Sequence, residues 1–185
     1  MKIGVIDYGA SNIFSVVRAL NSLGASTKIL KKSKDFENID KLVFPGQGSM
    51  GACLKKLSEN DLRDALIFSL KNLPFLGICL GLQILFSESE ESEDEKGLGI
   101  FPEKIKKFSE FKDRTIKIPH MGWNQVEFSQ SHFIWEGLES SKDFYFVHSY
   151  ASKEIDEKYI YSKTFHGESF NSAVAKDNIL SLIHI

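Results

Sequence analysis

The sequence has 185 residues, which is enough for one domain with a sizeable hydrophobic core. Its hydrophobic content of 42% excludes an intrinsically disordered chain, and its net charge of −2 excludes the basic surface that nucleic acids or anionic membranes require. Two cysteines are too few for a disulfide framework or a multi-cysteine zinc site. We therefore expect a single cytoplasmic domain over residues 1–185, with two free thiols, no metal or cofactor, and no nucleic-acid or membrane partner.

Strands and helices alternate in the first half of the sequence. Short apolar runs predict strands at residues 2–6, 27–30, 41–44 and 74–78. Apolar residues at helical spacing predict helices between residue 13 and Gly24, through 54–57 and 62–70, and directly after Cys79. This alternation is typical of a parallel sheet with helices packed against it.

The sequence after Gly99 consists of short strand-like runs separated by turns. These runs lie at residues 105–108, 115–118, 123–128, 144–147, 158–164, 169–175 and 178–183. We therefore predict an α/β fold in which the N-terminal half is a doubly wound, mainly parallel sheet and the C-terminal half is rich in strands. Both halves are expected to pack on one core.

Residues 87–96, with the sequence SESEESEDEK, are biased in composition and hold six carboxylates. Such a segment could bind a metal ion or a partner protein. Clustered like charges repel each other and stay hydrated, so we favour a solvated, mobile loop.

The strongest local signal is Gly77-Ile78-Cys79-Leu80-Gly81, which lies where an apolar strand turns into a helix. It matches the nucleophile-elbow pattern G-x-nucleophile-x-G, with cysteine as the nucleophile. The sharp turn requires small neighbours, and the helix start is expected to lower the thiol pKa and to leave the Leu80 N–H free as an oxyanion donor. The alternative is a buried cysteine between two packing glycines, and the pentapeptide alone leaves both readings open.

A glycine-rich loop, FPGQGS at residues 44–49, closes the strand before the elbow. The glycines on either side of Gln47 would let its peptide turn and present its N–H to an anion. In a doubly wound sheet this loop and the elbow both lie at the carboxyl ends of strands, where ligands bind. An ordinary strand-to-helix turn is the alternative. Cys53 follows without an elbow and is interpreted as a core residue.

Four motifs together resemble a known family. GICLGLQ at residues 77–83 is similar to the nucleophile motif of the class I, triad-type glutamine amidotransferases. IDYGASN at 6–12, IPHMGWN at 118–124 and FYFVHSY at 144–150 resemble segments of the glutaminase subunit of imidazole glycerol phosphate synthase. The resemblance runs in order from Met1 to about Asp177. It implies a flavodoxin-like glutamine amidotransferase fold and a heterodimer with a (β/α)8 cyclase.

The resemblance also implies roles for individual residues. Cys79 would be the nucleophile, and the backbone N–H groups of Gln47 and Leu80 would hold the oxyanion. The substrate glutamine would be bound by Gly46, Gly48, Gln83, Ser149 and Tyr150. The contact with the cyclase would lie at His120, Met121, Trp123 and Asn124. Without the resemblance, this last segment favours a strand that packs its tryptophan into the core.

The implied reaction is hydrolysis of glutamine to glutamate and ammonia. The ammonia would pass to the cyclase, which makes imidazole glycerol phosphate and AICAR in histidine biosynthesis. Two alternatives stay open, namely a paralogous glutaminase that supplies ammonia for amidination of a surface sugar, and a non-catalytic binding subunit.

Two positions depart from the family pattern. Ser11 stands where glycine is usual, and it could cap the following helix. The late His-Pro-Glu that supplies the general base is absent, so we expect an incomplete C-terminal end and poor glutaminase activity. Ile185 would occupy the histidine position. His184, the candidate replacement base, would face the other side of the strand unless a bulge turns it toward Cys79.

Overall fold

The computed structural model describes residues 1–9, 12–111, 113 and 115–185. The first half contains β1 (Lys2–Ile6), α1 (Ile13–Ser22), β2 (Ser26–Leu30), β3 (Lys41–Gly46), α2 (Met50–Glu59), α3 (Arg63–Leu70), β4 (Phe75–Cys79) and α4 (Leu80–Gln83). The second half contains β5 (Phe86–Ser89), β6 (Phe101–Lys107), β7 (His120–Phe128), β8 (Ser141–His148), β9 (Tyr150–Ser152), β10 (Ile160–His166), β11 (Glu168–Lys176) and β12 (Ile179–Leu182). Short 3-10 helices form η1 (Ser33–Phe36), η2 (Phe133–Trp135) and η3 (Glu157–Tyr159).

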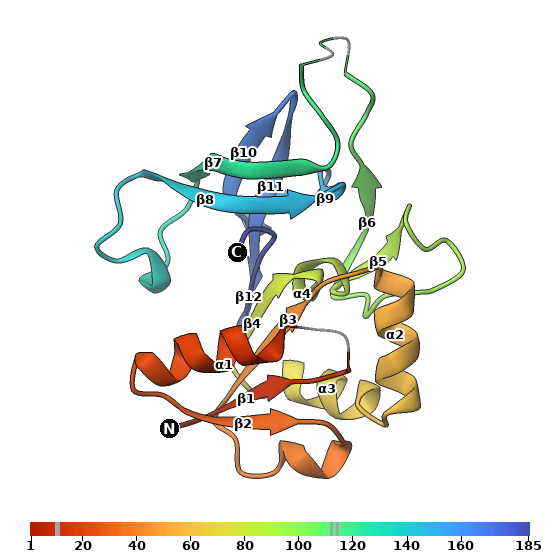
Figure 1. Cartoon of the computed structure of the whole chain (residues 1–185), viewed down its shortest axis with the longest axis vertical. Coiled ribbons are helices and arrows are strands. Elements are labelled where there is room, and N and C mark those ends of the chain that lie inside the picture. The colour runs from red at the N-terminus through yellow and green to blue at the C-terminus, as the bar shows by residue number, and fades with distance from the viewer. Residues whose placement is uncertain (10–11, 112, 114) are drawn as a thin grey trace.

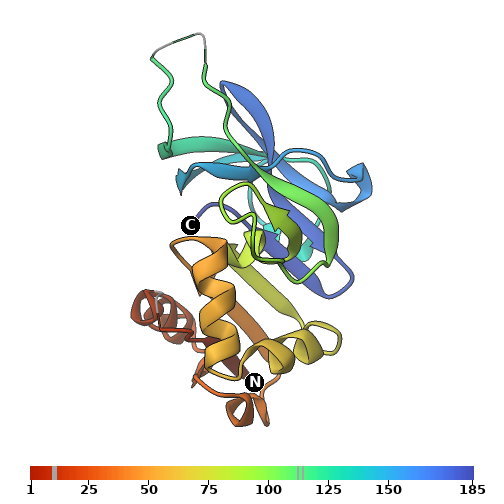
Figure 2. The same ribbon diagram turned by 90° about the vertical axis from the view of Figure 1, so that its right-hand side faces the viewer.

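The N-terminal half is a parallel sheet covered on both faces. Its strands lie in the order β2-β1-β3-β4, and β12 adds to β4 in the same direction. Helix α1 packs Val16 and Leu20 against Ile3 and Val43 on one face. Helices α2 and α3 lie on the opposite side of the sheet (Figures 1 and 2). The predicted doubly wound arrangement is therefore confirmed.

Antiparallel strands form the second half. The sheet continues from β12 through β11 and β10 to β7 and β8, and β9 and β6 branch from β11. In Figure 1, β7 and β8 lie above the parallel half, and β12 connects the two parts. Because β12 is parallel to β4 and antiparallel to β11, the sheet changes character at this strand. The carboxyl ends of β3 and β4 thus face the antiparallel half.

Some predicted elements differ from the structure. Residues 115–118 do not form a strand, because the N–H and hydroxyl of Thr115 both donate to the Asp113 carboxylate and the chain turns there. Strands β5 and β9 are additional to those predicted. Both are short, at four and three residues, so neither leaves a clear alternating pattern. The expected cap at Ser11 lies outside the described residues.

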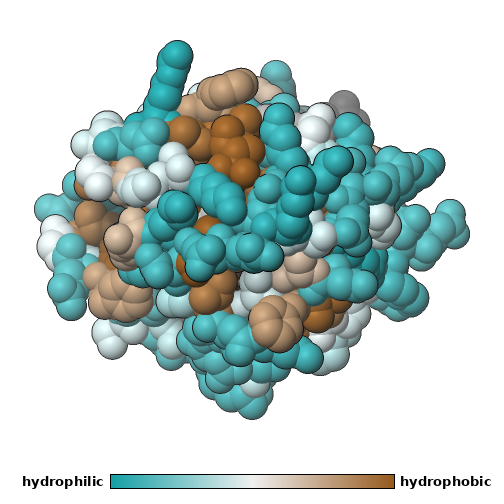
Figure 3. All heavy atoms as spheres, turned by 90° about the horizontal axis from the view of Figure 1, so that it is seen from below, coloured by the Kyte–Doolittle hydropathy of each residue, from teal (hydrophilic) through white to brown (hydrophobic). Residues whose placement is uncertain are grey.

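On one face of the molecule, hydrophobic side chains are scattered among polar ones. Figure 3 shows a largely hydrophilic face on which hydrophobic side chains appear in separate patches. Exposed apolar residues include Phe14 and Leu23 at opposite ends of α1 and Phe68 on α3. Isolated exposures of this kind are normal for a folded protein. In the described part of the chain, no helix has the length and apolar character needed to span a bilayer.

Candidate active site

Cys79 occupies a strained turn between β4 and α4. Its backbone has φ 56° and ψ −105°, a conformation that residues with a side chain rarely adopt. The glycines two positions away are required by space. A Cβ on Gly77 would lie 2.1 Å from the Ser181 hydroxyl, and one on Gly81 would lie 2.3 Å from the Phe44 carbonyl oxygen. The local geometry therefore agrees with the elbow predicted from the spacing.

The expected lowering of the thiol pKa is wrong for this structure. Burial raises the pKa of the Cys79 thiol to about 11, because the thiolate loses hydration. The hydrogen bond from the Leu80 N–H acts in the opposite direction but is the smaller effect, and the Glu91 carboxylate raises the pKa further. Helix α4 has four residues, so its dipole at the sulfur is weak.

A tyrosine holds the Gln47 peptide. The Tyr8 hydroxyl accepts a hydrogen bond from the Gln47 N–H and donates one to the Gln47 carbonyl oxygen, each at 3.1 Å, so it holds the peptide units on both sides of this residue. Tyr8 is fully buried and stacks on Phe44. The Gln47 N–H is thus engaged, and its predicted role as oxyanion donor requires the peptide to turn between its flanking glycines. Sequence reasoning missed Tyr8, because nothing in its motif indicates this contact.

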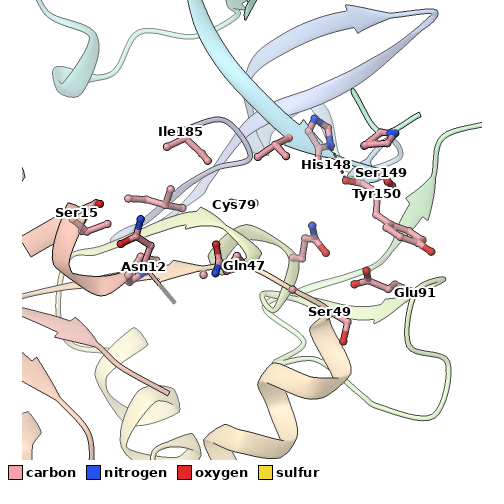
Figure 4. A pocket seen from close by; sticks show the side chains of 18 residues that line it. Asn12, Ser15, Gln47, Ser49, Cys79, Glu91, His148, Ser149, Tyr150 and Ile185 are labelled. Atoms are coloured by element: carbon pink, nitrogen blue, oxygen red, sulfur yellow. Dashed lines mark hydrogen bonds between the residues drawn. The ribbon is translucent and has the colours of Figure 1, made fainter. Parts of the chain in front are cut away.

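Cys79 opens into a cavity of about 540 Å³ between the two halves of the protein (Figure 4). All five residues predicted to hold glutamine line it, namely Gly46, Gly48, Gln83, Ser149 and Tyr150. The register of β3 with β4 places Gly46 directly beside Cys79. Ser149 and Tyr150 reach the cavity from the junction of β8 and β9, across from the elbow. The fold thus brings together residues that are about 100 positions apart in the sequence.

The acidic segment takes part in the cavity wall. Glu91 lines the cavity, and its Oε2 accepts a hydrogen bond of 3.1 Å from the Met50 N–H. The Ser92 hydroxyl accepts one of 2.9 Å from the Gly51 N–H. The first N–H groups of α2 have no partner within the helix, so these side chains satisfy them. The expectation of a solvated, mobile loop is therefore wrong for Glu91 and Ser92.

Two polar groups of the cavity wall can face a ligand. Gln83 is 5% exposed, and its Oε1 has no hydrogen-bond partner in the protein. Glu91 keeps its second carboxylate oxygen, and burial raises its pKa. Tyr150 lines the same cavity as Glu91, and burial followed by the carboxylates of Glu91 and Glu90 raises the pKa of its hydroxyl. The composition SESEESEDEK carried no signal that distinguished Glu91 from its neighbours.

His184 and Ile185 lie on opposite sides of the chain. Ile185 lines the cavity, as its predicted register requires, and its N–H donates to the Tyr145 carbonyl. His184 is 2% exposed and packs its ring against Phe144, with 4.3 Å between ring centroids. The pairing of β12 with β4 is regular up to Leu182, and of the two residues that end the chain only Ile185 lines the cavity that holds Cys79. The geometry gives no support to His184 as the replacement base, because its ring packs on Phe144 and does not line the cavity.

The residues predicted to contact a partner divide between two faces of β7. Met121 and Trp123 are 61% and 74% exposed. His120 is buried and Asn124 half-buried, because alternate residues of a strand face opposite sides. The exposure of Trp123 excludes the alternative in which it packs into the core. Cys53, by contrast, is buried in the main core as expected, and burial raises its pKa to about 12.

Three buried histidines are expected to make the stability of the protein depend on pH. Burial lowers the pKa of His148 and His184 to about 4 and that of His120 to about 3, from an ordinary value of 6.5. Between the lowered pKa values and the ordinary value of 6.5, these histidines bind more protons in the unfolded chain than in the folded chain. A lower pH in this range therefore favours unfolding. The urea midpoint should therefore fall as the pH decreases from about 6.5 to about 5.

Urea titrations across this range measure the effect, and His184→Phe is the matched variant. It keeps an aromatic ring against Phe144 but removes one titrating group. The variant should show a weaker dependence on pH. If the urea midpoint of His184→Phe depended on pH as strongly as that of the unmodified protein, His184 would not contribute to the pH dependence.

Comparisons with known proteins agree with this geometry. The family model "Glutamine amidotransferase class-I" matches residues 4–182. The chain is 41% identical over 182 residues to imidazole glycerol phosphate synthase subunit HisH of Sulfurimonas denitrificans, with 97% of this chain and 87% of the relative covered. It is 40% identical over 181 residues to the same subunit of Hydrogenovibrio crunogenus, covering 96% of this chain and 85% of the relative.

Solved structures share the fold at low sequence identity. A crystal structure of a glutamine amidotransferase superposes with a TM-score of 0.76 at 18% identity, covering 99% of this chain and 89% of the other. PurLQS from Thermotoga maritima gives a TM-score of 0.73 at 16% identity, covering 100% and 86%. Taken with the family model and the relatives, these similarities place the chain in the class I glutamine amidotransferase family, among the HisH subunits of imidazole glycerol phosphate synthase.

Proposed function

We propose that the chain is the glutaminase subunit of an imidazole glycerol phosphate synthase and acts in histidine biosynthesis. The observation that carries this proposal is the position of Cys79, at an elbow that opens into a cavity lined by glutamine-binding candidates. The HisH relatives favour the histidine pathway over a sugar-modifying paralogue. The partner would be the (β/α)8 cyclase, which receives the ammonia.

The cavity offers a group for each part of glutamine. The ammonium group of the substrate is complementary to the Glu91 carboxylate, and its carboxylate can bind backbone N–H groups at Ser149 and Tyr150. The side-chain amide then extends toward Cys79. Gln83 Oε1, which lacks a partner, supplies an acceptor for a substrate N–H. This orientation brings the amide carbonyl to the sulfur.

The proposed reaction proceeds through a thioester. The Cys79 sulfur loses its proton and attacks the amide carbon, and the Leu80 N–H stabilises the oxyanion. The carbon–nitrogen bond breaks, and the nitrogen takes a proton and leaves as ammonia. Water then cleaves the thioester, which yields glutamate and the free thiol. Because burial raises the pKa of the thiol to about 11, the thiol is protonated at neutral pH, and the reaction requires removal of this proton.

The exposed face of β7 and β8 has the properties of a partner surface. Trp123 pairs with Tyr145 and Met121 with Val147, and all four side chains are exposed. Val147 also lines the cavity, so this apolar patch reaches the cavity rim. A partner bound here would cover the mouth through which ammonia leaves. Aromatic residues and methionine are enriched in protein interfaces.

Alkylation tests the role of Cys79. A glutamine-like alkylating agent should label Cys79, and free glutamine should protect it. With iodoacetamide, the labelling rate should rise by about tenfold per pH unit between about pH 7 and 9, because the thiolate is the nucleophile. Peptide mass spectrometry locates the label. Cys53, which is 1% exposed, is the internal control. Labelling confined to Cys53 would show that Cys79 is not the nucleophile.

The Glu91 proposal predicts a change in substrate affinity. Glu91→Gln keeps an oxygen that can accept from the Met50 N–H but removes the charge that faces the substrate ammonium. We expect the KM for glutamine to rise by about tenfold or more, with a smaller change in kcat, in the assay with the cyclase. Glu93→Gln, an exposed carboxylate of the same segment, is the matched control. Equal KM values for both variants would contradict the proposal.

Trp123→Ala tests the partner surface. Loss of a large exposed aromatic side chain at an interface should weaken cyclase binding by about tenfold or more. Calorimetry or surface plasmon resonance gives the affinity, and turnover of the assembled enzyme gives the coupling. Phe133→Ala is the control, because Phe133 is 73% exposed on η2, outside β7 and β8. Unchanged affinity and turnover in Trp123→Ala would place the interface elsewhere.

A further inference from the structure

A group of buried histidines lies behind the proposed glutamine site. His120 and His148 are 3% and 5% exposed, and they pair directly across β7 and β8. His120 Nδ1 is 3.2 Å from His148 Nε2, and His166 stacks on His120 with 4.0 Å between ring centroids. Burial of two paired imidazoles demands partners for their ring nitrogens. These partners form a continuous series of hydrogen bonds.

The direction of each hydrogen bond follows from its two ends. The Tyr150 carbonyl oxygen can only accept, so His148 must donate to it from Nδ1, at 2.9 Å. In the neutral ring His148 Nε2 is then an acceptor, and His120 donates to it from Nδ1. His120 Nε2 accepts in turn from the Asn124 amide, at 3.1 Å. We name this series, from Asn124 through His120 and His148 to the Tyr150 carbonyl, the histidine relay.

The orientation of Asn124 fixes the other end. Its Nδ2 also donates to the Phe165 carbonyl oxygen at 2.9 Å, and its Oδ1 accepts from the Gln125 N–H at 2.8 Å. Both hydrogens of the amide are therefore used, one of them on His120. Only one tautomer of each histidine satisfies all these contacts, with the proton on Nδ1 in both rings.

The histidine relay ends at Tyr150, the first residue after the connection between β8 and β9. Tyr150 lies in the cavity wall, and the preceding residue, Ser149, connects β8 to β9. The Ser149 carbonyl is held separately by the Phe108 N–H. His148 Nδ1 thus supplies a second fixed point for this short connection, through the Tyr150 carbonyl.

We propose that His120 and His148 are positioning residues that fix the backbone at Ser149 and Tyr150 for binding of glutamine. This inference rests on the proposed function and adds the groups that shape its substrate site. His148 lines the cavity, but both of its ring nitrogens are engaged, so it acts through Tyr150 rather than on the thiol. Among the described residues, no cluster of histidine, cysteine and carboxylate side chains is arranged to hold a metal ion.

The tautomers give a direct test in the unmodified protein. Long-range ¹⁵N–¹H correlation spectra of the histidine side chains report which ring nitrogen carries the proton. At neutral pH, His120 and His148 should both appear as neutral rings protonated on Nδ1. Protonation on Nε2 in either ring would break the series of donors and acceptors and would overturn the relay.

Glutamine binding tests the positioning role. In the Cys79→Ala chain, which cannot turn over, calorimetry gives the Kd for glutamine. Adding His148→Leu should raise this Kd by about tenfold, because the Tyr150 carbonyl loses its donor. Adding His148→Asn, whose amide can replace the Nδ1 donor, should restore most of the affinity. His166→Phe, which keeps a ring stacked on His120 outside the relay, should leave the Kd unchanged.

The outcomes separate this inference from the proposed function. If Cys79→Ala binds no glutamine, the proposed function fails, and the spectra still decide whether the relay exists. If Cys79→Ala binds glutamine and His148→Leu does not change the Kd, the positioning role is wrong. In the active chain with the cyclase, His148→Leu should raise KM and leave kcat within about threefold. A large loss of kcat at constant KM would mean that His148 acts on the reacting atoms.

Discussion

The absence of side chains at Gly77 and Gly81 is the constraint on which the site depends. Each glycine lies so close to a neighbouring strand that a methyl group would overlap a Ser181 or Phe44 oxygen. This close approach lets β4 turn sharply into α4 while it remains paired with β3 and β12. Cys79 is held at the apex of that turn with a positive φ. The surrounding strands thus sustain a conformation that the residue alone disfavours.

Both the Cys79 thiol and the Gln47 N–H are held by their surroundings in this structure. Burial keeps the Cys79 sulfur protonated, and the Gln47 N–H donates a hydrogen bond to the Tyr8 hydroxyl. The proposed reaction requires both to change, because the sulfur must lose its proton and the Gln47 N–H must turn toward the oxyanion. For the proposed glutaminase, activation would therefore require a turn of the loop at Gln47 and removal of the thiol proton.

Both halves line the cavity, with Ser149 and Tyr150 from the antiparallel half and the candidate nucleophile Cys79 from the parallel half. Tyr150 and Ser149 stand above the elbow because β12 joins the two halves through β4 and β11. The same half exposes Trp123 on one face of β7 and buries His120 on the other. One strand therefore carries both the candidate partner surface and part of the support for the substrate site. Strand alternation alone produces this division.

The sequence by itself determined the parts that depend on local spacing. Alternating strands and helices predicted the doubly wound half, and G-x-C-x-G predicted the elbow at Cys79, because a sharp turn restricts its neighbours wherever it occurs. The regular alternation of a strand also placed His184 and Ile185 on opposite sides. The order of four motifs was enough to indicate the family. Such features require only neighbours along the chain.

The tertiary structure decided what depends on residues far apart in sequence. Glu91 lines the cavity because it accepts a hydrogen bond from an N–H group at the start of α2. In the sequence it cannot be distinguished from the acidic residues around it. The thiol pKa rose rather than fell because burial, which no local pattern reports, outweighs the single turn of α4. The contacts of Tyr8 with Gln47 and of His120 with His148 join segments that are far apart in the sequence, so they form only in the folded chain. Desolvation and long-range hydrogen bonds are properties of the folded chain, so only the fold could set them.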